Sequence, residues 1–108
     1  HQGILISIDI FAAQGALTGF SARGHADTAP YGEDIVCAAV SSACLLTANT
    51  ITEVLHLPAA AEMKDGFLQL RLSGDTAPAQ VLLQGLKLHL SALSEQYPQS
   101  IQVLISEV

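Results

Sequence analysis

The chain has 108 residues, half of them hydrophobic, and a formal net charge of −6 at pH 7. This length and composition fit one domain with a single core and exclude a disordered chain. Its four Lys and Arg residues are too few for a phosphate-binding stripe, so direct nucleic-acid binding is not expected. An acidic surface instead favours a basic protein or peptide partner through long-range attraction.

The sequence also bears on location. We find no apolar run of about 20 residues and therefore expect no membrane-spanning helix. The first extended run is too short, and too acidic at Asp9, for a secretory signal. Cys37 and Cys44 lie seven positions apart on one predicted helix, a rise of about 10 Å that is too long for a disulfide within that helix. Without a disulfide framework, a reducing, cytoplasmic setting is expected.

The N-terminal part alternates apolar and polar residues and predicts an antiparallel hairpin. Residues 4–11 have the period of two that is typical of a half-buried strand, and a second extended run covers residues 16–23. Residues 12–15 form the turn between them, in which Gly15 can adopt a positive φ.

A long helix is predicted to begin at Asp34 and to end at Leu57-Pro58, because a residue before proline avoids the helical region. Its many alanine and serine residues allow close packing, so we expect it to be the central, most buried helix. Its apolar stripe follows three- and four-residue steps and consists of Val36, Val40, Ala43, Thr47, Ile51 and Val54.

The second half predicts another hairpin, a second helix and a last strand. Residues 59–63 and 67–72 flank Lys64-Asp65-Gly66, and Asp-Gly between apolar runs is a strong hairpin signal. A helix then extends to about Gln96, and an alternating strand follows from Ile101. The order β-β-α-β-β-α-β, with alternating rather than all-apolar strands, predicts a two-layer α+β fold. We expect a mostly antiparallel sheet with two helices stacked on it, and residues 1–108 as one domain.

The stretch from Gly24 to Ser41 carries the candidate chemistry. With Asp34 as N-cap, Cys37 occupies the third helical position, where free N–H groups and the helix dipole lower the pKa of a thiol. A histidine within hydrogen-bond reach would complete an activated Cys/His pair, and His25 lies on the loop that returns to this helix. Ser41, one turn after Cys37, could hydrogen-bond near the thiol or simply fill space.

Structural explanations compete with each of these assignments. A lone cysteine in an alanine-rich helix is usually a small buried hydrophobe, which is our interpretation of Cys44. Asp34 is a structural cap rather than a third catalytic group, because its carboxylate would point at backbone N–H groups. His56 is assigned to a helix C-terminus and His89 to an exposed helical position. The histidines and cysteines lack the close spacing of a zinc site, so no metal is expected.

At these residues the sequence resembles the ribosomal-processing cysteine protease family, Prp. The family pattern is Gly-His-Ala, a loop, and Tyr-Gly-x-Asp-Ile-Val-Cys-Ala running into a helix with a serine one turn later. The match is specific over this stretch, whereas the rest of the chain resembles the family only in length and element order. The matching residues are Gly24-His25-Ala26, Tyr31-Gly32-Glu33-Asp34-Ile35-Val36-Cys37-Ala38 and Ser41.

The resemblance implies a small cytoplasmic protease of bacteria that removes a short N-terminal extension from a large-subunit ribosomal protein, after a pair of aromatic residues. It assigns the nucleophile to Cys37 and the base to His25. It also implies a homodimer without metal or cofactor. The substrate-binding or supporting residues that it suggests are Gly24, Tyr31, Asp34 and Ser41.

Two other functions stay open on the sequence alone. In a non-enzymatic ribosome-assembly module, the same loop would grip a peptide and the cysteine would only pack. A thiol redox sensor is the third hypothesis, although no resolving cysteine lies within reach. We further expect residues 26–33, with few apolar residues apart from Tyr31, to become ordered only with substrate and then to bring His25 to Cys37.

Overall fold

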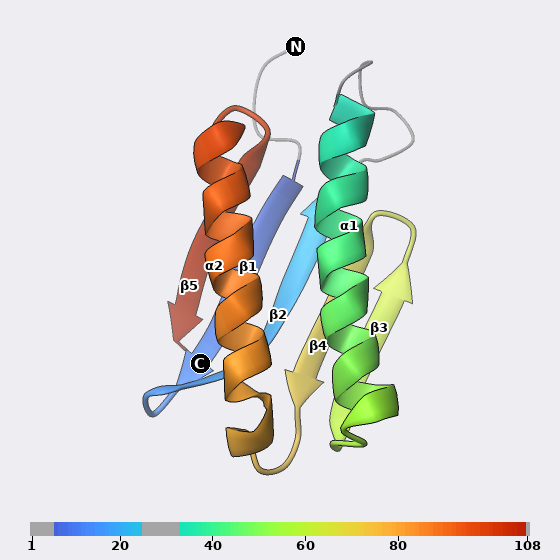
Figure 1. Cartoon of the computed structure of the whole chain (residues 1–108), viewed down its shortest axis with the longest axis vertical. Helices are drawn as coiled ribbons and strands as arrows, with labels where there is room; N and C mark the ends of the chain where they lie inside the picture. Colours follow the sequence, from blue (N-terminus) through green and yellow to red (C-terminus); the bar gives the residue numbers. More distant parts are fainter. Residues whose placement is uncertain (1–5, 25–32, 108) are drawn as a thin grey trace.

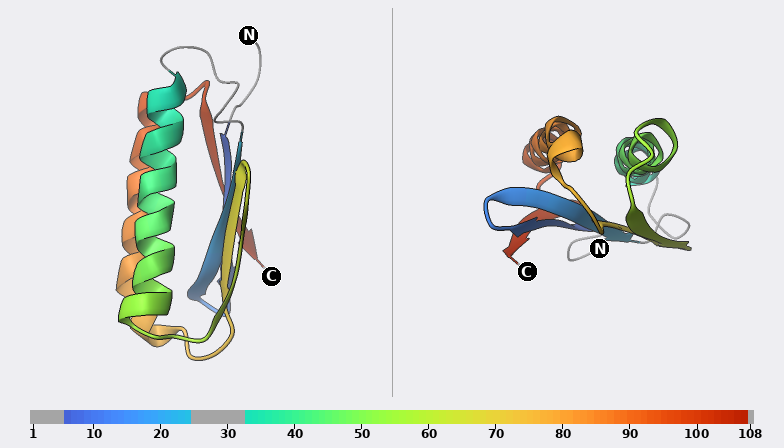
Figure 2. Two further views of the ribbon diagram at one scale, coloured as in Figure 1. Left: turned by 90° about the vertical axis from the view of Figure 1, so that its right-hand side faces the viewer. Right: turned by 90° about the horizontal axis from the view of Figure 1, so that it is seen from below.

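The computed structural model describes the backbone of residues 6–24 and 33–107. Two long helices lie side by side on one face of a five-stranded sheet, so the molecule has two layers (Figures 1 and 2). This confirms the predicted α+β class and the order β-β-α-β-β-α-β. The strands are β1 (Ile6–Ala13), β2 (Ala16–Gly24), β3 (Ala59–Lys64), β4 (Phe67–Leu72) and β5 (Ile101–Glu107), and the long helices are α1 (Glu33–Asn49) and α2 (Gln80–Gln96).

The strands lie in the order β3-β4-β2-β1-β5. Each of the pairs β3–β4, β4–β2 and β2–β1 is antiparallel, and β5 runs parallel to β1. The parallel pair is possible because α2 carries the chain from β4 across the helix face of the sheet to β5 at its edge. The sheet is therefore mixed but mostly antiparallel, as predicted.

The β1–β2 hairpin closes more tightly than predicted. Gln14 and Gly15 alone form the turn, with φ values of 54° and 82°. Two residues of positive φ match the twist of the flanking strands, so β1 continues to Ala13 where a longer turn was expected.

Gln80, the first residue of α2, ties the helix layer to the sheet. Its Oε1 accepts a hydrogen bond from the Leu17 N–H at 2.9 Å, and its Nε2 donates to the Leu17 carbonyl at 2.7 Å. The same Nε2 donates to the Thr76 carbonyl at 2.8 Å. One amide side chain thus occupies the place that a neighbouring strand would take beside Leu17.

The core lies between the sheet and the helices. Residues of β1 alternate, so that Ile6, Ile8 and Ile10 face the helices in register with Ala22 and Phe20 of β2. The helices contribute residues at three- and four-residue spacing to the same core. The fully buried large side chains of this core include Phe20, Ile51, Leu70, Leu83 and Leu90.

On the opposite face of the sheet, three cationic side chains stack on two aromatic rings. The guanidinium of Arg71 lies 4.0 Å from the ring centre of Phe11, and Arg23 and Lys64 lie 5.2 and 5.5 Å from that of Phe67. Such cation–π contacts shield the aromatic rings where no helix covers them. Three of the four Lys and Arg residues of the chain lie on this face.

The helix α1 differs from its prediction at both ends. It begins at Glu33, so Asp34 lies inside the first turn and not at the N-cap. An acidic residue is favourable anywhere in a first turn, so residue type could not distinguish these positions. At the other end, α1 passes into a π-helical turn, η1 (Thr50–Val54). This wider turn rotates Val54 out of the apolar stripe, and its side chain is 69 % exposed.

The sequence argument against a membrane-spanning helix was wrong in its premise that no segment is long and apolar enough. The segment Ile35–Val54 is long and apolar enough to cross a membrane by length and composition. Its threonine and serine residues interrupt the apolar run without lowering the average enough to exclude a span. In the structure this segment is the helix whose Val40, Cys44 and Ile51 side chains pack in the core, and a buried core helix passes the same test.

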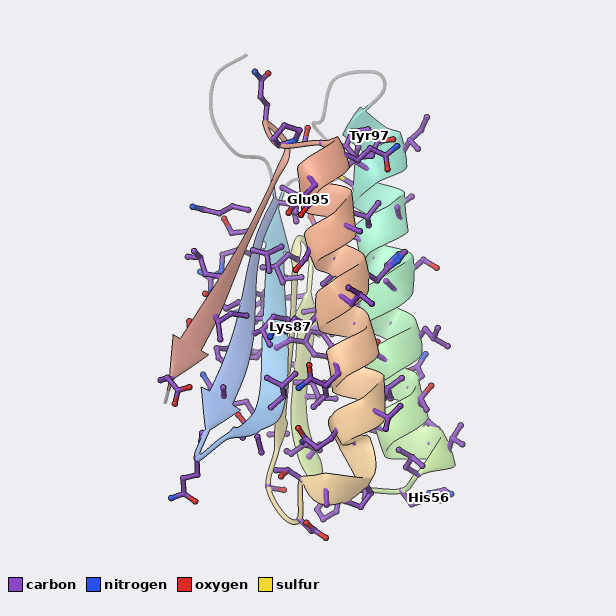
Figure 3. The ribbon with its side chains drawn as sticks, turned by 60° about the vertical axis from the view of Figure 1, so that its left-hand side comes forward. His56, Lys87, Glu95 and Tyr97 are labelled. Carbon is purple, nitrogen blue, oxygen red and sulfur yellow. The ribbon has the colours of Figure 1, made fainter. Side chains whose placement is uncertain are left out.

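The second half of the chain follows the prediction closely. Asp65 and Gly66 form the β3–β4 turn. A short 3-10 turn, η2 (Ala77–Ala79), precedes α2, and the Asp75 carboxylate accepts a hydrogen bond from the Ala77 N–H at 3.1 Å. α2 ends at Gln96, as predicted, and its C-cap Tyr97 lies at the same end of the molecule as the start of α1 (Figure 3).

Candidate active site

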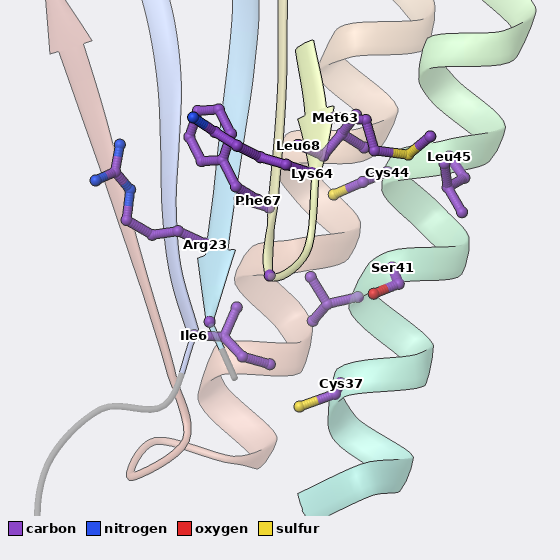
Figure 4. A pocket seen from close by; sticks show the side chains of 14 residues that line it. Ile6, Arg23, Cys37, Ser41, Cys44, Leu45, Met63, Lys64, Phe67 and Leu68 are labelled. Carbon is purple, nitrogen blue, oxygen red and sulfur yellow. The ribbon is translucent and has the colours of Figure 1, made fainter. Parts of the chain in front are cut away.

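A pocket of about 150 Å³ opens between the first half of α1 and the strands beneath it (Figure 4). Its strand side is formed by the end of β2 and by the tip of the β3–β4 hairpin. From α1 it receives side chains at three- and four-residue spacing, which therefore share one face of the helix. The α1 residues that line the pocket are Cys37, Val40, Ser41, Cys44 and Leu45.

The Cys37 side chain points from α1 toward the strands (Figure 4). It is 6 % exposed and lies one turn before Ser41, which is exposed and lines the same pocket. Because α1 begins at Glu33, Cys37 is the fifth helical residue and not the third. The free N–H groups of a helix belong to its first turn, so the dipole acts on this thiol from two residues, about half a turn, further away than predicted.

Cys44 has the structural role that was predicted for it. It is 1 % exposed, and burial raises the pKa of its thiol from 9.0 to about 12. It therefore stays protonated at neutral pH. The two thiols do not form a disulfide with each other, as their spacing on one helix required.

Two glycines fix the strand side of the pocket. The Gly24 N–H, at the end of β2, donates a hydrogen bond to the Gly66 carbonyl at 2.9 Å. Gly66 has a φ of 73°, and a Cβ at this position would lie 2.4 Å from the Gly24 carbonyl oxygen. Only glycine therefore allows the hairpin tip to approach β2 this closely. Both glycines line the pocket that Cys37 faces.

Several predicted site residues lie outside the described residues. These are His25 and Tyr31, the side chain of Asp34, and the loop 26–33 to which the ordering prediction applies, of which only the backbone of Glu33 is described. Gly24, which directly precedes His25 in the sequence, is described and lines the pocket.

The two histidines that the structure does describe are poor candidates for a base beside Cys37. His56 is exposed and follows η1, at the end of the molecule opposite the start of α1 (Figure 3), whereas Cys37 lies in the first half of that helix. His89 is exposed on α2. Neither is among the described residues that line the pocket. Within the described residues, no group of three or more His, Cys, Asp or Glu side chains could hold a metal ion.

Sequence reasoning missed the hairpin wall of the pocket. Met63, Lys64, Phe67 and Leu68 line it together with Arg23. The Asp-Gly turn was identified in the sequence, but the strand order that places this hairpin opposite α1 is a tertiary property. No local pattern reports it.

A thiol on the first half of a helix faces a pocket, an arrangement that suits a nucleophilic cysteine, and the comparisons identify the class of enzyme. The family model described as cysteine protease Prp matches residues 5–102. The chain belongs to this family of cysteine proteases. Membership favours the enzymatic hypothesis over the binding module.

Known relatives match nearly the whole chain. The ribosomal processing cysteine protease Prp of Staphylococcus aureus is 29 % identical over 103 residues, which are 92 % of this chain and 97 % of the relative. The structure of SMU.848 from Streptococcus mutans has a TM-score of 0.85 at 27 % identity and covers 97 % of both chains. The S. aureus protease in complex with a substrate peptide has a TM-score of 0.85 at 27 % identity, covering 94 % of this chain and 100 % of that one.

Proposed function

We propose that this protease removes the N-terminal extension of a large-subunit ribosomal protein, with Cys37 as nucleophile and His25 as base. One observation carries the proposal. Cys37 and Gly24, the residue before His25, line a single pocket in a chain that belongs to the Prp family. The S. aureus relative, a ribosomal processing protease with a structure in complex with a substrate peptide, supports a peptide of this kind as substrate.

The reaction follows from the chemistry of a thiol and an imidazole. His25 takes the proton of the Cys37 thiol, and the sulfur attacks the scissile carbonyl to form a tetrahedral intermediate. The imidazolium then protonates the leaving amine, which departs and leaves an acyl-enzyme. Water, deprotonated by His25, hydrolyses the thioester and regenerates the thiol. The free N–H groups in the first turn of α1 are candidates to stabilise the oxyanion.

We also propose the cellular setting that the resemblance implies. The protease acts in the cytoplasm as a homodimer, without a metal or a cofactor and without direct nucleic-acid contact. Large exposed apolar side chains on the helices, such as Leu46 and Leu88, support a protein-covered surface there. Light scattering of the purified protein tests the dimer, since a monomer has a mass of 11.3 kDa.

Incubation with a synthetic peptide tests the main proposal. The peptide spans the N-terminal extension and the first mature residues of the ribosomal protein, and mass spectrometry follows its cleavage. The expected result is one cut after the aromatic pair by the wild-type protein and none by Cys37→Ala. A peptide that binds but stays intact with the wild-type protein would instead support the non-enzymatic module.

A further inference from the structure

The sheet has two edges, and one of them borders the active-site pocket. β3 is the outermost strand on the side of α1, and five of its six residues are exposed. Met63, near the end of β3, lines the pocket, whereas the described lining residues include none from β5 at the other edge. An edge strand presents unpaired N–H and C=O groups that can pair with another extended chain.

The hydrogen-bond pattern shows which groups of β3 face outward. The Ser73 N–H donates to the Pro58 carbonyl at 3.0 Å, in the same register as the β3–β4 pairs. Bonded and non-bonded pairs alternate along an antiparallel ladder. The next bonded pairs are therefore those of Ala60, Glu62 and Lys64 with β4, and the outward-facing backbone groups belong to Ala59, Ala61 and Met63.

The β2–β4 pair gives the same assignment independently. The Gly24–Gly66 hydrogen bond lies in register with the pairs of β2 and β4, so the even-numbered residues of β4 bond to β2. Its odd-numbered residues, including Phe67 and Gln69, then bond to Lys64 and Glu62 of β3. Both arguments leave the backbone of Ala61 and Met63 facing the open side.

The side of α1 that faces β3 forms, together with Met63, a mostly apolar surface beside this edge, which we call the floor and which consists of Ser41, Leu45 and Met63. Met63 and Leu45 are 69 % and 38 % exposed, both line the pocket, and Ser41 lies one turn before Leu45. Figure 4 shows Met63 and Leu45 close together at the end of the pocket away from Cys37. Ala59 and Ala61 point to the same face of the sheet as Met63 and carry too little bulk to obstruct it.

We propose that an extended segment of the substrate adds to the sheet as a further strand along β3, with its alternate side chains on this floor. The inference rests on the proposed protease function and specifies how that site holds its peptide. Recognition of this kind combines main-chain hydrogen bonds with pockets for every second side chain.

The strand β3 leads directly to the catalytic pocket, which identifies the substrate peptide as the chain that pairs with it. β3 ends at the hairpin tip, whose Gly66 lines the pocket with Cys37. A peptide that pairs along β3 and extends past Met63 therefore reaches the Cys37 thiol. The net charge of −6 further favours a basic segment over an acidic one. Six residues of β3 offer pairing over about 20 Å, the length of five or six substrate residues.

A matched pair of variants tests the main-chain contact. Ala61→Pro removes one outward N–H, whereas Ala61→Val keeps it and adds similar bulk. Proline is tolerated at an edge position whose N–H is not used by the ladder, so both variants should fold. In the Cys37→Ala background, Ala61→Pro should weaken the Kd of the synthetic ribosomal-protein peptide by about two- to tenfold relative to Ala61→Val.

An N-methyl scan of the same peptide provides a test on the unaltered enzyme. Methylation of a backbone nitrogen removes a donor, and only every second nitrogen of an added strand faces its neighbour. Cleavage by the wild-type protein should therefore fall at alternate positions along the bound segment. A uniform or irregular effect would overturn the proposal.

The outcomes separate this inference from the function on which it rests. If the unmodified peptide is cleaved but the scan shows no alternation and the two Ala61 variants bind equally, the strand addition is wrong and the protease assignment stands. If the unmodified peptide is neither bound nor cleaved, both are wrong. If Ala61→Pro changes the mass of the free protein in solution but not peptide binding, the edge pairs with a second copy, which overturns the inference.

Discussion

Cys37 and Cys44 face the same pocket from one helix but have different environments. Cys44 is almost completely buried, and its thiol has a pKa of about 12 because burial disfavours the thiolate. Cys37 lies two turns nearer the start of α1 and lines the pocket together with Gly24, the residue that precedes His25 in the sequence. Position on the helix, rather than residue type, distinguishes the proposed nucleophile from the packing residue.

Replacing each cysteine separates these roles. Cys37→Ala should lower kcat by about 10³-fold or more, because no other group can form the acyl-enzyme. Cys37→Ser should retain little activity, since a hydroxyl is far less ionised than a thiol. Cys44→Ala should change kcat by no more than about twofold and lower stability by about 1 kcal/mol. Steady-state cleavage measures kcat of each variant, and urea unfolding measures the stability of Cys44→Ala. Loss of activity in Cys44→Ala alone would refute the assignment.

Alkylation provides a second test of the two thiols. Iodoacetamide reacts with the thiolate, and a pKa of about 12 leaves only about 10⁻⁵ of Cys44 ionised at pH 7. Brief treatment of the folded protein should therefore label Cys37 first, as peptide mass mapping will show. Labelling of Cys44 should rise as the pH increases toward 12 and should become equal only in urea. Equal labelling at neutral pH would contradict the assignment.

The β3–β4 hairpin is the element that builds the strand wall of the pocket. Its tip is held against β2 by the hydrogen bond between Gly24 and Gly66. The hairpin was predicted correctly from Asp65-Gly66, because the turn chemistry is local. Its contact with β2 and its place opposite α1 were not, because they depend on the order of strands in the sheet.

Gly66→Ala should displace this hairpin and impair cleavage. The added methyl group would meet the Gly24 carbonyl, in addition to the cost of a positive φ, so we expect a loss of about 2–3 kcal/mol in stability. Gly15→Ala is the matched control. Gly15 also has a positive φ, but a Cβ there meets nothing within 4 Å, so it should cost only about 1 kcal/mol and leave kcat/KM unchanged. Thermal unfolding and peptide cleavage compare the two variants.

Gln80 allows a test of stability that is independent of the pocket. Gln80→Ala removes the hydrogen bonds to both backbone groups of Leu17, which should cost about 1–3 kcal/mol. The control is Gln84→Ala, an exposed position one turn later on α2, which should stay within about 0.5 kcal/mol of wild type. Urea unfolding measures both changes. An equal effect of the two substitutions would show that the hydrogen bonds of Gln80 to Leu17 do not contribute to the free energy of unfolding.

For the molecule as a whole, periodic patterns predicted the elements and their type. The alternation in residues 4–11 and the turn at Asp65-Gly66 report local geometry, so the strands and hairpins were found. The π-helical turn at Thr50–Val54 was missed, because a helical stripe does not show where the ladder widens. The candidate nucleophile was recognised from its motif, whereas the strand wall of its pocket required the fold.

The parallel pairing of β5 with β1 has a consequence for how the chain acquires its structure. The two strands come from opposite ends of the sequence, so this contact has nearly the largest chain separation that the molecule allows. Contacts of this kind form slowly, because a long loop must close, at a cost in entropy, before the contacts can stabilise the fold. During synthesis, β1 therefore lacks one neighbour until the last strand has left the ribosome, and Ile6, which lines the pocket, belongs to β1. Until β5 has been made, the strand that carries this pocket residue pairs only with β2, so the sheet beside the pocket reaches its final form late.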